Sequence, residues 1–242
     1  MLKKILIIGA SGGNLPGVER DVANYKNFFL SSLGGAWLDS EIVTLESPAP
    51  EVVRAQLKNL SQLDYSVVVF AGHGSHPKQD GATFVQLQPK VSLSADELKV
   101  GAPKHTLILD CCRQLEPEII MDSAMEALAK AAQQIDKSEC RKWFEYSIAA
   151  CSKGLVTMFA CDIDETAGET RRGGFYSSAL LSEAQSWQLT KNIDTSKEFL
   201  ALSVTAAHTR AEQTVKRISG GRQNPVCEYP RVDKQFPFAI IA

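Results

Sequence analysis

The sequence predicts a single α/β domain in which an open, mostly parallel sheet of about six strands lies between layers of helices. Short apolar runs rich in strand-forming residues alternate along the chain with longer segments of helical periodicity, as in parallel α/β sheets. The 242 residues are 44% hydrophobic and 22% charged, which suits one sizeable core. Two of the apolar runs end in chemically reactive residues, and parallel sheets place ligands at the carboxyl ends of their strands.

Composition excludes several classes of function. The net charge of −2 gives no reason to expect a nucleic-acid partner or an anionic membrane surface. No apolar run approaches the 18 or more residues that a membrane helix needs. Residues 1–8 are basic and then apolar, but the run is short and passes into a glycine-rich stretch, so it is better explained as a strand than as a signal peptide. We therefore expect a cytoplasmic protein.

Cysteine usage supports the same location. The six cysteines form no Cys-x-x-Cys pair and no regular spacing. Free thiols in a reducing compartment explain this pattern better than a disulfide framework. The paired ligand spacing of structural zinc modules is missing, so no zinc site is expected and no residue is assigned as a metal ligand.

The first half of the chain is expected to supply four strands. Residues 9–17 are glycine-rich and follow the first strand, but Pro16 interrupts the Gly-x-Gly-x-x-Gly order that a dinucleotide site requires. We favour a connecting loop, with a Rossmann-like nucleotide-binding enzyme as an alternative. Asp21 lies in the first turn of the next helix, where a carboxylate suits the helix dipole. The predicted elements are strands 4–8, 41–45, 65–71 and 106–109, helices 18–33 and 50–60, a hairpin arm at 84–87 and a capped short helix at 94–98.

The second half continues the alternation with less regularity. Residues 116–138 are charged and alanine-rich, and are compatible with either a helix or a mobile segment. The remaining predicted elements are helix 139–151, strand 155–160, a helix that begins after Gly173 and Gly174, a long helix at 196–218, a loop at 220–225 and a closing strand at 236–241.

A histidine and a cysteine follow two of the predicted strands. His73 lies between two glycines after strand 65–71, and Cys111 and Cys112 follow strand 106–109 through Asp110. Neighbouring parallel strands lie about 4.8 Å apart, so these residues would meet over one cleft as a thiol and its base. The N–H groups of Gly74 and of the cysteine would be available to hold an oxyanion. The ordinary alternatives are a buried cysteine that serves as a small hydrophobe and a structural histidine.

These motifs resemble those of the caspase-like cysteine peptidases, and most closely those of metacaspases and bacterial caspase-domain proteins. The resemblance spans nearly the whole chain, although only the His and Cys motifs are specific. Gln precedes the cysteine by two residues in strict caspases, whereas Asp110 stands at that position here. The stretches that carry the resemblance are Leu15-x-Gly17 with Asp21, Ala71-Gly72-His73-Gly74, Asp110-Cys111-Cys112, residues 160–169, and Gly174-Phe175 before a helix.

The resemblance implies a role for each matching residue. His73 would be the general base and Cys112 the nucleophile, with Cys111 at a variable position and the N–H groups of Gly74 and Cys112 in the oxyanion hole. Asp21, Asp110 and Ala71 would line the substrate pocket. Two buried carboxylates would favour cleavage after Arg or Lys. Ala71 replaces a serine of the family pattern and Arg113 replaces a histidine, so Arg113 is a candidate to offset part of the pocket's negative charge.

The resemblance also implies an arrangement of the whole chain. Residues 1–115 would correspond to the family's first subunit and residues 151–242 to its second. Residues 116–150 would be the linker at which relatives cut themselves, although a helix with a solvated face is favoured. No cofactor is expected. Calcium activation stays open, because the acidic residues Asp162, Asp164, Glu165 and Glu169 lack the order of a dedicated calcium loop.

The resulting hypothesis is a caspase-like three-layer sandwich that acts as a Cys-His endopeptidase on protein or peptide substrates. Its state as monomer or homodimer is left open, because strand 236–241 is compatible with either a pairing edge or a covered one. A catalytically inactive caspase-like scaffold is the main alternative, given Ala71 and the Arg113-Gln114 pair. A hydrolase of the amidotransferase kind is disfavoured, because no Gly-x-Cys-x-Gly elbow surrounds either cysteine.

Overall fold

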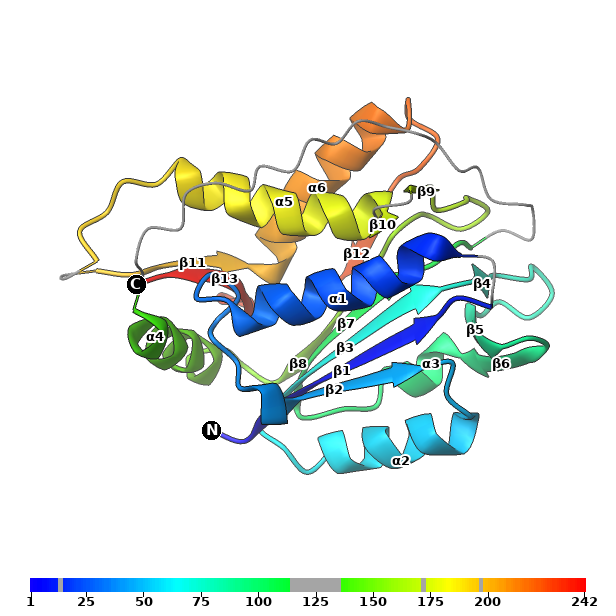
Figure 1. The fold of residues 1–242 in the computed structure, drawn as a ribbon, viewed down its shortest axis with the longest axis horizontal. Helices are drawn as coiled ribbons and strands as arrows, with labels where there is room; N and C mark the ends of the chain where they lie inside the picture. The colour runs from blue at the N-terminus through cyan, green and yellow to red at the C-terminus, as the bar shows by residue number, and fades with distance from the viewer. Residues whose placement is uncertain (13–14, 114–135, 171–172, 196–197) are drawn as a thin grey trace.

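The structure is a computed structural model that describes residues 1–12, 15–113, 136–170, 173–195 and 198–242. Its centre is a six-stranded sheet in the order β12-β8-β7-β3-β1-β2 (Figure 1). All neighbouring pairs are parallel except β12 with β8. The predicted open and mostly parallel sheet is therefore confirmed. Its strands are β1 (Lys3–Ala10), β2 (Ile42–Glu46), β3 (Tyr65–Gly72), β7 (Lys104–Asp110), β8 (Gly154–Phe159) and β12 (Val226–Glu228).

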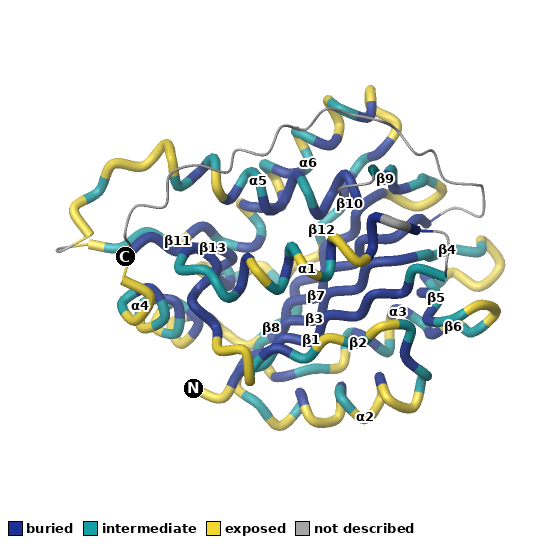
Figure 2. The backbone as a smooth tube through the Cα atoms, in the orientation of Figure 1, coloured by how far each residue is buried: buried dark blue, intermediate teal, exposed yellow. Residues whose placement is uncertain are grey.

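Helices cover both faces of this sheet, which gives the predicted three layers. One face carries α2 (Pro50–Leu60) and α3 (Ala95–Leu98), together with a small sheet of β4 (Gly74–Ser75), β5 (Phe84–Gln88) and β6 (Val91–Ser94). The other face carries α1 (Pro16–Leu30), α4 (Lys137–Ala149), α5 (Phe175–Leu189) and α6 (Val204–Ile218). Figure 2 shows the central strands buried between these layers.

The alternation of side chains along each strand explains why the strands are apolar throughout. In β1, Ile5 and Ile7 pack into the core on the α1 side, while Leu6 and Ile8 pack into the core on the α2 side. The same division holds along β3 and β7. A strand that is buried on both faces favours apolar side chains along its whole length. The buried polar side chains near the starts of β3 and β7 are hydrogen-bonded to one another, Ser66 to His105 at 2.7 Å and Tyr65 to Thr106 at 3.0 Å.

The structure corrects two details of the second half. Residues 200–203 form strand β11 (Leu200–Ser203) and not the start of a helix, because Ser203 is the N-cap of α6 and accepts a hydrogen bond from Ala206 N–H at 3.2 Å. The closing strand, β13 (Pro237–Ile241), pairs with β11 in a separate two-stranded sheet and is wholly buried. The sixth strand of the main sheet is instead β12, for which we predicted no strand.

Part of the predicted linker lies outside the described residues, which omit 114–135. Its last part, with the basic residues Lys137, Arg141 and Lys142, belongs to α4, which begins at the N-cap Asp136. Of the helices that the structure describes, none is long and apolar enough to cross a membrane.

Two further elements complete the frame around the strand ends. A short hairpin pairs β9 (Glu169–Thr170) with β10 (Gly173–Gly174), directly before α5. A 3₁₀ turn, η1 (Asp39–Glu41), precedes β2 at the opposite end of the sheet. The arrows of β1, β2 and β3 in Figure 1 point away from both chain ends, so the carboxyl ends of these strands lie on the side of the sheet opposite the termini.

Candidate active site

The ends of β3 and β7 bring the histidine and cysteine segments together. Ala71 pairs with Asp110 in the parallel register, so the segments that carry His73 and Cys112 leave the sheet from neighbouring strand ends. A side chain at Gly74 would place its Cβ 2.6 Å from Cys111 Sγ and 2.7 Å from the carbonyl oxygen of Cys112. Only glycine allows the chain after His73 to pass so close to the cysteines.

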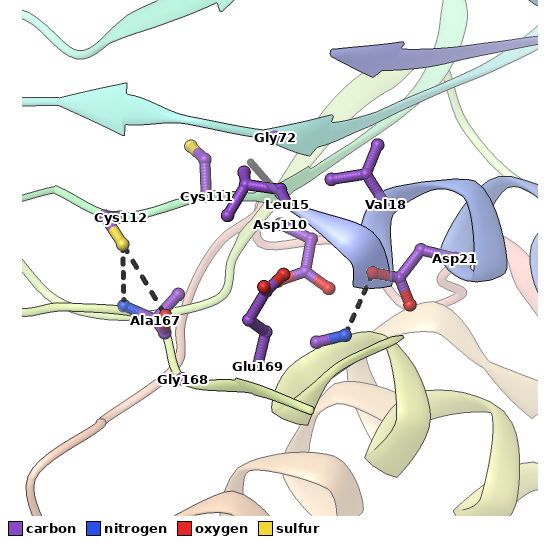
Figure 3. Close-up of a pocket in the computed structure, with 11 residues that line it drawn as sticks. Leu15, Val18, Asp21, Gly72, Asp110, Cys111, Cys112, Ala167, Gly168 and Glu169 are labelled. Atoms are coloured by element: carbon purple, nitrogen blue, oxygen red, sulfur yellow. Dashed lines mark hydrogen bonds between the residues drawn. The ribbon is translucent and has the colours of Figure 1, made fainter. Parts of the chain in front are cut away.

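Cys112 has its thiol on the α1 side of the sheet, where it is almost completely buried, with 4% of the residue exposed. Ala167 N–H donates a hydrogen bond to Cys112 Sγ at 3.2 Å, and the thiol donates to the carbonyl oxygen of Ala167 at 3.5 Å (Figure 3). Both backbone polar groups of Ala167 therefore contact the sulfur of Cys112.

Cys111 belongs to the opposite face of the sheet. It packs in the core cluster on the α2 side and is 2% exposed. Burial raises the pKa of the Cys111 thiol well above its usual range, and the neighbouring Cys161 and Cys112 raise it further. A thiol with a raised pKa is a poor nucleophile, so this position fits a packing residue.

Three carboxylates line a pocket beside Cys112. Asp21 comes from α1, Asp110 from the end of β7 and Glu169 from β9, and Figure 3 shows them around one space. Each of the three residues is at most 6% exposed. Leu15 and Val18 form an apolar part of the same lining.

The start of α5 holds two of these carboxylates in place. Gly174 N–H donates to Asp21 Oδ2 at 2.9 Å, and the Ser177 hydroxyl donates to Asp21 Oδ1 in a short hydrogen bond. Ser177 N–H donates to Asp110 Oδ2 at 3.0 Å. Ser177 therefore binds both aspartates, and it tethers α5 to α1 and β7.

The surroundings of Asp21 oppose its charge. Burial raises the pKa of the Asp21 carboxyl well above its usual range, and the negative charge of Asp110 raises it further. The hydrogen bonds from Ser177 and Gly174 act in the opposite direction, while Glu169 adds to the rise. A cation in the pocket would relieve this repulsion.

Ala71 and Arg113 differ from the other predicted site residues. Ala71 is buried in β3 and packs with Leu15 and Val18, which themselves line the pocket. Arg113 directs its guanidinium elsewhere: its Nε donates to Thr83 Oγ1 at 3.3 Å, and it lies 4.2 Å from the centre of the Phe159 ring. Our expectation that Arg113 offsets the charge of the pocket does not fit these contacts.

The acidic residues after β8 have separate partners. Glu165 accepts hydrogen bonds from the backbone and side chain of Asn224 at 2.7 and 2.6 Å, and Asp164 forms an ion pair with Lys78 at 3.1 Å. Glu169 lines the pocket instead. Among the described residues, no group of three or more His, Cys, Asp and Glu side chains is arranged to hold a metal ion.

The loop after β8 is fixed by a buried glutamine that the sequence analysis did not single out. Gln223 Oε1 accepts from Gly168 N–H at 2.9 Å, and its Nε2 donates to the carbonyl oxygen of Ala160 at 2.8 Å. The residues between these two contacts include Ala167, which holds the Cys112 thiol. Gln223 thus positions the backbone next to the thiol.

Two glycines in the stretch that suggested a nucleotide site serve close packing. A Cβ at Gly9 would meet Val22 Cγ2 at 2.6 Å, so this glycine lets α1 pack directly on β1. A Cβ at Gly17 would lie 2.9 Å from Glu169 Oε2, so this glycine makes room for a carboxylate. Neither contact suits a phosphate group, because one neighbour is apolar and the other is acidic.

Fold and site together define an α/β domain of the caspase type, with a histidine and a cysteine after neighbouring parallel strands. The model of the Caspase domain (peptidase C14) matches residues 2–237, and the chain therefore belongs to this family. The crystal structure of caspase-1 from Spodoptera frugiperda is similar, with a TM-score of 0.58 and 10% identity over 93% of this chain and 87% of that chain. No curated protein matches the sequence significantly.

Proposed function

We propose that the chain is a cysteine endopeptidase that cleaves protein or peptide substrates after Arg or Lys. The observation that carries this proposal is the pocket beside Cys112 that three carboxylates line. A pocket of that charge favours a cationic side chain, and its position next to the thiol suits the residue before the scissile bond.

In the proposed reaction His73 takes the proton of the Cys112 thiol, and the thiolate attacks the scissile carbonyl carbon. The N–H groups of Gly74 and Cys112 stabilise the oxyanion that forms. The C–N bond then breaks, the leaving amine takes the proton from His73, and an acyl-enzyme remains on sulfur. Water that His73 deprotonates hydrolyses this thioester and restores the free thiol.

The proposal includes the arrangement of the whole chain. Residues 1–115 and 151–242 act as first- and second-subunit-like parts of one domain, with residues 116–150 between them. The reaction needs no cofactor, and calcium enters only as an activator to be tested. The expected location is the cytoplasm.

Fluorogenic peptides that end in Arg, Lys or Asp, with and without calcium, test this function. Replacing Cys112 with alanine should lower kcat for Arg and Lys peptides by about 10³-fold or more, because the covalent step is lost. Cys111→Ala is the matched control and should retain turnover. Turnover confined to Asp peptides would contradict the proposed pocket, and equal turnover by Cys112→Ala would contradict the nucleophile.

One observation favours a second candidate, a catalytically inactive binding scaffold. The Cys112 thiol is buried and is held by both backbone groups of Ala167. A peptidyl-Arg chloromethyl ketone separates the two functions, because only an accessible, reactive thiol is alkylated. Labelling of the wild type and of Cys111→Ala, but not of Cys112→Ala, supports the peptidase. Absence of labelling in the wild type supports the scaffold.

A further inference from the structure

We propose that Cys112 and Cys161 are a redox pair, in which oxidation by a peroxide joins the two sulfurs in a reversible disulfide. Such a bond withdraws the Cys112 sulfur from any reaction with a substrate. The pair goes beyond the proposed function, because it needs only the placement of the two thiols and can form in a peptidase or in a scaffold.

Cys161 follows β8 and lies against the backbone of the two adjacent cysteines. Ala160 N–H donates to the carbonyl oxygen of Leu109 at 2.9 Å, so β7 and β8 remain paired up to the residue before Cys161. The Cys161 thiol donates to the carbonyl oxygen of Cys111 at 3.5 Å. That oxygen belongs to the peptide group that joins Cys111 to Cys112, so the sulfur of Cys161 lies within roughly 7 Å of Cys112 Cα.

A second contact holds Cys161 from the other side of Cys112. The carbonyl oxygen of Glu165 accepts from the Cys161 thiol at 3.3 Å and from Arg113 N–H at 3.0 Å. Cys161 thus touches the residue before Cys112 and shares an acceptor with the residue after it. Neighbouring strands lie about 4.8 Å apart, which is inside the range of about 4.4–6.8 Å that disulfides span between Cα atoms. Little backbone movement is therefore needed to join the two sulfurs.

The two faces of the sheet distinguish Cys112 from Cys111. Cys112 and Cys161 both belong to the core cluster on the α1 side, whereas Cys111 belongs to the cluster on the α2 side. Figure 3 shows the thiols of Cys111 and Cys112 on opposite sides of their strand, as expected for consecutive residues of an extended chain. A bond between Cys111 and Cys161 is the rival, and the variants below distinguish it.

Exposure decides which thiol reacts first. Cys112 lines the pocket, so a small peroxide such as hydrogen peroxide reaches it there. Cys161 is fully buried, and burial raises the pKa of its thiol well above the usual range, while the charge of Cys112 raises it further. A thiol of this kind resists direct oxidation, so the reaction begins at Cys112 and ends at Cys161.

Two steps transfer two electrons from the thiols to the peroxide. The Cys112 thiolate attacks one peroxide oxygen, the O–O bond breaks, and a sulfenic acid forms while the hydroxide that leaves takes up a proton as water. The Cys161 sulfur then attacks the sulfenic sulfur, the S–O bond breaks, and the hydroxyl leaves with the Cys161 proton as a second water. Two equivalents of a thiol reductant reverse the bond. The raised pKa of Cys161 makes the second step slow, so we expect it over hours.

Mass spectrometry tests the pair without relying on catalysis. The wild type is treated with hydrogen peroxide, its remaining thiols are blocked with iodoacetamide, and it is digested with trypsin without reduction. We expect a cross-link between the peptide of Cys112 and that of Cys161, which dithiothreitol separates. Trypsin leaves Cys111 and Cys112 on one peptide, so single variants assign the bond. Cys111→Ala should keep the cross-link, and Cys112→Ala and Cys161→Ser should lose it.

Reversibility gives a second readout. Cys161→Ser keeps a hydroxyl donor for the carbonyl of Glu165, but excess peroxide should carry its Cys112 to the irreversible sulfinic acid. Labelling by a peptidyl-Arg chloromethyl ketone should fall about tenfold or more in both oxidised proteins and return with dithiothreitol only in the wild type. Absence of the cross-link in the wild type, its persistence in Cys112→Ala, or equal recovery in Cys161→Ser would overturn the proposal. A Cys112–Cys161 cross-link in a protein that cleaves no peptide would uphold the pair and refute the peptidase.

Discussion

Asp21 carries a carboxylate in surroundings that oppose its charge. It is buried next to Asp110 and Glu169, and the hydrogen bonds from Ser177 and Gly174 compensate only in part, since the pKa remains raised. Carboxyl groups with a shifted pKa are frequent at binding sites, where repulsion between like charges lowers stability but favours binding of a ligand of opposite charge. The cost appears when the pocket is empty, and it makes the role of Asp21 testable by stability as well as by activity.

Asp21→Asn should stabilise the empty protein while it weakens binding of Arg peptides. A carboxyl whose pKa is raised by folding binds its proton more tightly in the folded state, so its contribution to stability is lost as pH rises through the folded pKa. Asn does not ionise, so Asp21→Asn does not lose stability in this way. The difference in the free energy of unfolding between the variant and the wild type should therefore grow from about pH 4 to pH 7. Each 1 kcal/mol gained corresponds to about 2–4 °C in Tm for a chain of this size. Thermal unfolding at both pH values measures the effect.

Asp162→Asn provides the comparison for this prediction, because Asp162 is exposed and its replacement should leave Tm within about 1–2 °C. A lower Tm for Asp21→Asn at pH 7 would mean that the hydrogen bonds of the carboxylate outweigh the repulsion.

The sequence was sufficient to predict some of these residues but not all of them. Cys112, Asp21 and Asp110, which line the pocket, could be selected from motifs that are local in the sequence, and the role of His73 stays a prediction. Glu169 also lies in a matching stretch, but only the fold of the β9–β10 hairpin assigns it to the pocket. Ser177 hydrogen-bonds Asp21 and Asp110 because α5 begins beside α1 and β7. The pair Gly173 and Gly174 was the available signal, since adjacent glycines after an acidic stretch indicate a close approach of the backbone.

At the level of secondary-structure elements, the long two-sided strands were predictable and the short ones were not. Strands β1, β3 and β7 are buried on both faces and form continuous apolar runs. Strand β12 has only three residues, and none of them is buried. Strand β11 has four residues and leads directly into α6, so its leucines look like the first apolar positions of that helix. Such strands depend on their partners, β8 and β13, and not on their own pattern.

The loop between β8 and β9 is held by several contacts, of which the buried side chain of Gln223 lies nearest to Ala167 in the sequence. Gln223→Ala should destabilise the protein by about 1–3 kcal/mol, because the N–H of Gly168 and the carbonyl of Ala160 lose their buried partner. The resulting fall in Tm is about 2–12 °C. The loop carries Ala167, so the rate of Cys112 alkylation should change as well.

The matched control for this prediction is Gln213→Ala, on the exposed face of α6, which should shift stability by no more than about 0.5 kcal/mol. If Gln223→Ala is destabilised but its Cys112 is alkylated at the wild-type rate, Gln223 supports the fold without positioning Ala167 next to the thiol.

Across the whole molecule, the pocket and an ionic cluster occupy opposite ends of the sheet. The cluster joins the start of β1 to η1 and α4. Lys3 lies 3.5 Å from Glu41 and 3.6 Å from Glu145, and its Nζ lies 3.7 Å from the centre of the Trp37 ring. Burial lowers the pKa of Lys3 to about 8, although both glutamates act to raise it. Arg141 donates two hydrogen bonds to Glu41, at 2.6 and 2.8 Å.

This cluster connects Glu41 with Arg141, which lie 100 residues apart in the sequence and on either side of residues 114–135. It therefore secures α4 to the first strands of the sheet without help from the pocket. A change within it should alter global stability and leave the kinetics of the site intact.

Glu41→Gln tests this separation. Burial by itself would raise the pKa of Glu41, but hydrogen bonds from Arg141 and from Leu38 N–H, with the charge of Lys3, hold it at about 2. A carboxyl with a depressed pKa stabilises the folded state above its usual value of 4.5, and this contribution is lost as pH falls towards 2. Urea unfolding should therefore show a loss of about 1–3 kcal/mol in Glu41→Gln at pH 7, and the difference from the wild type should shrink between pH 4.5 and 2.

Glu51→Gln, at an exposed ion pair on α2, should show almost no loss at either pH. A difference that persists unchanged in acid would assign the effect to packing, and a change in KM for Arg peptides would show that the two ends of the sheet are coupled.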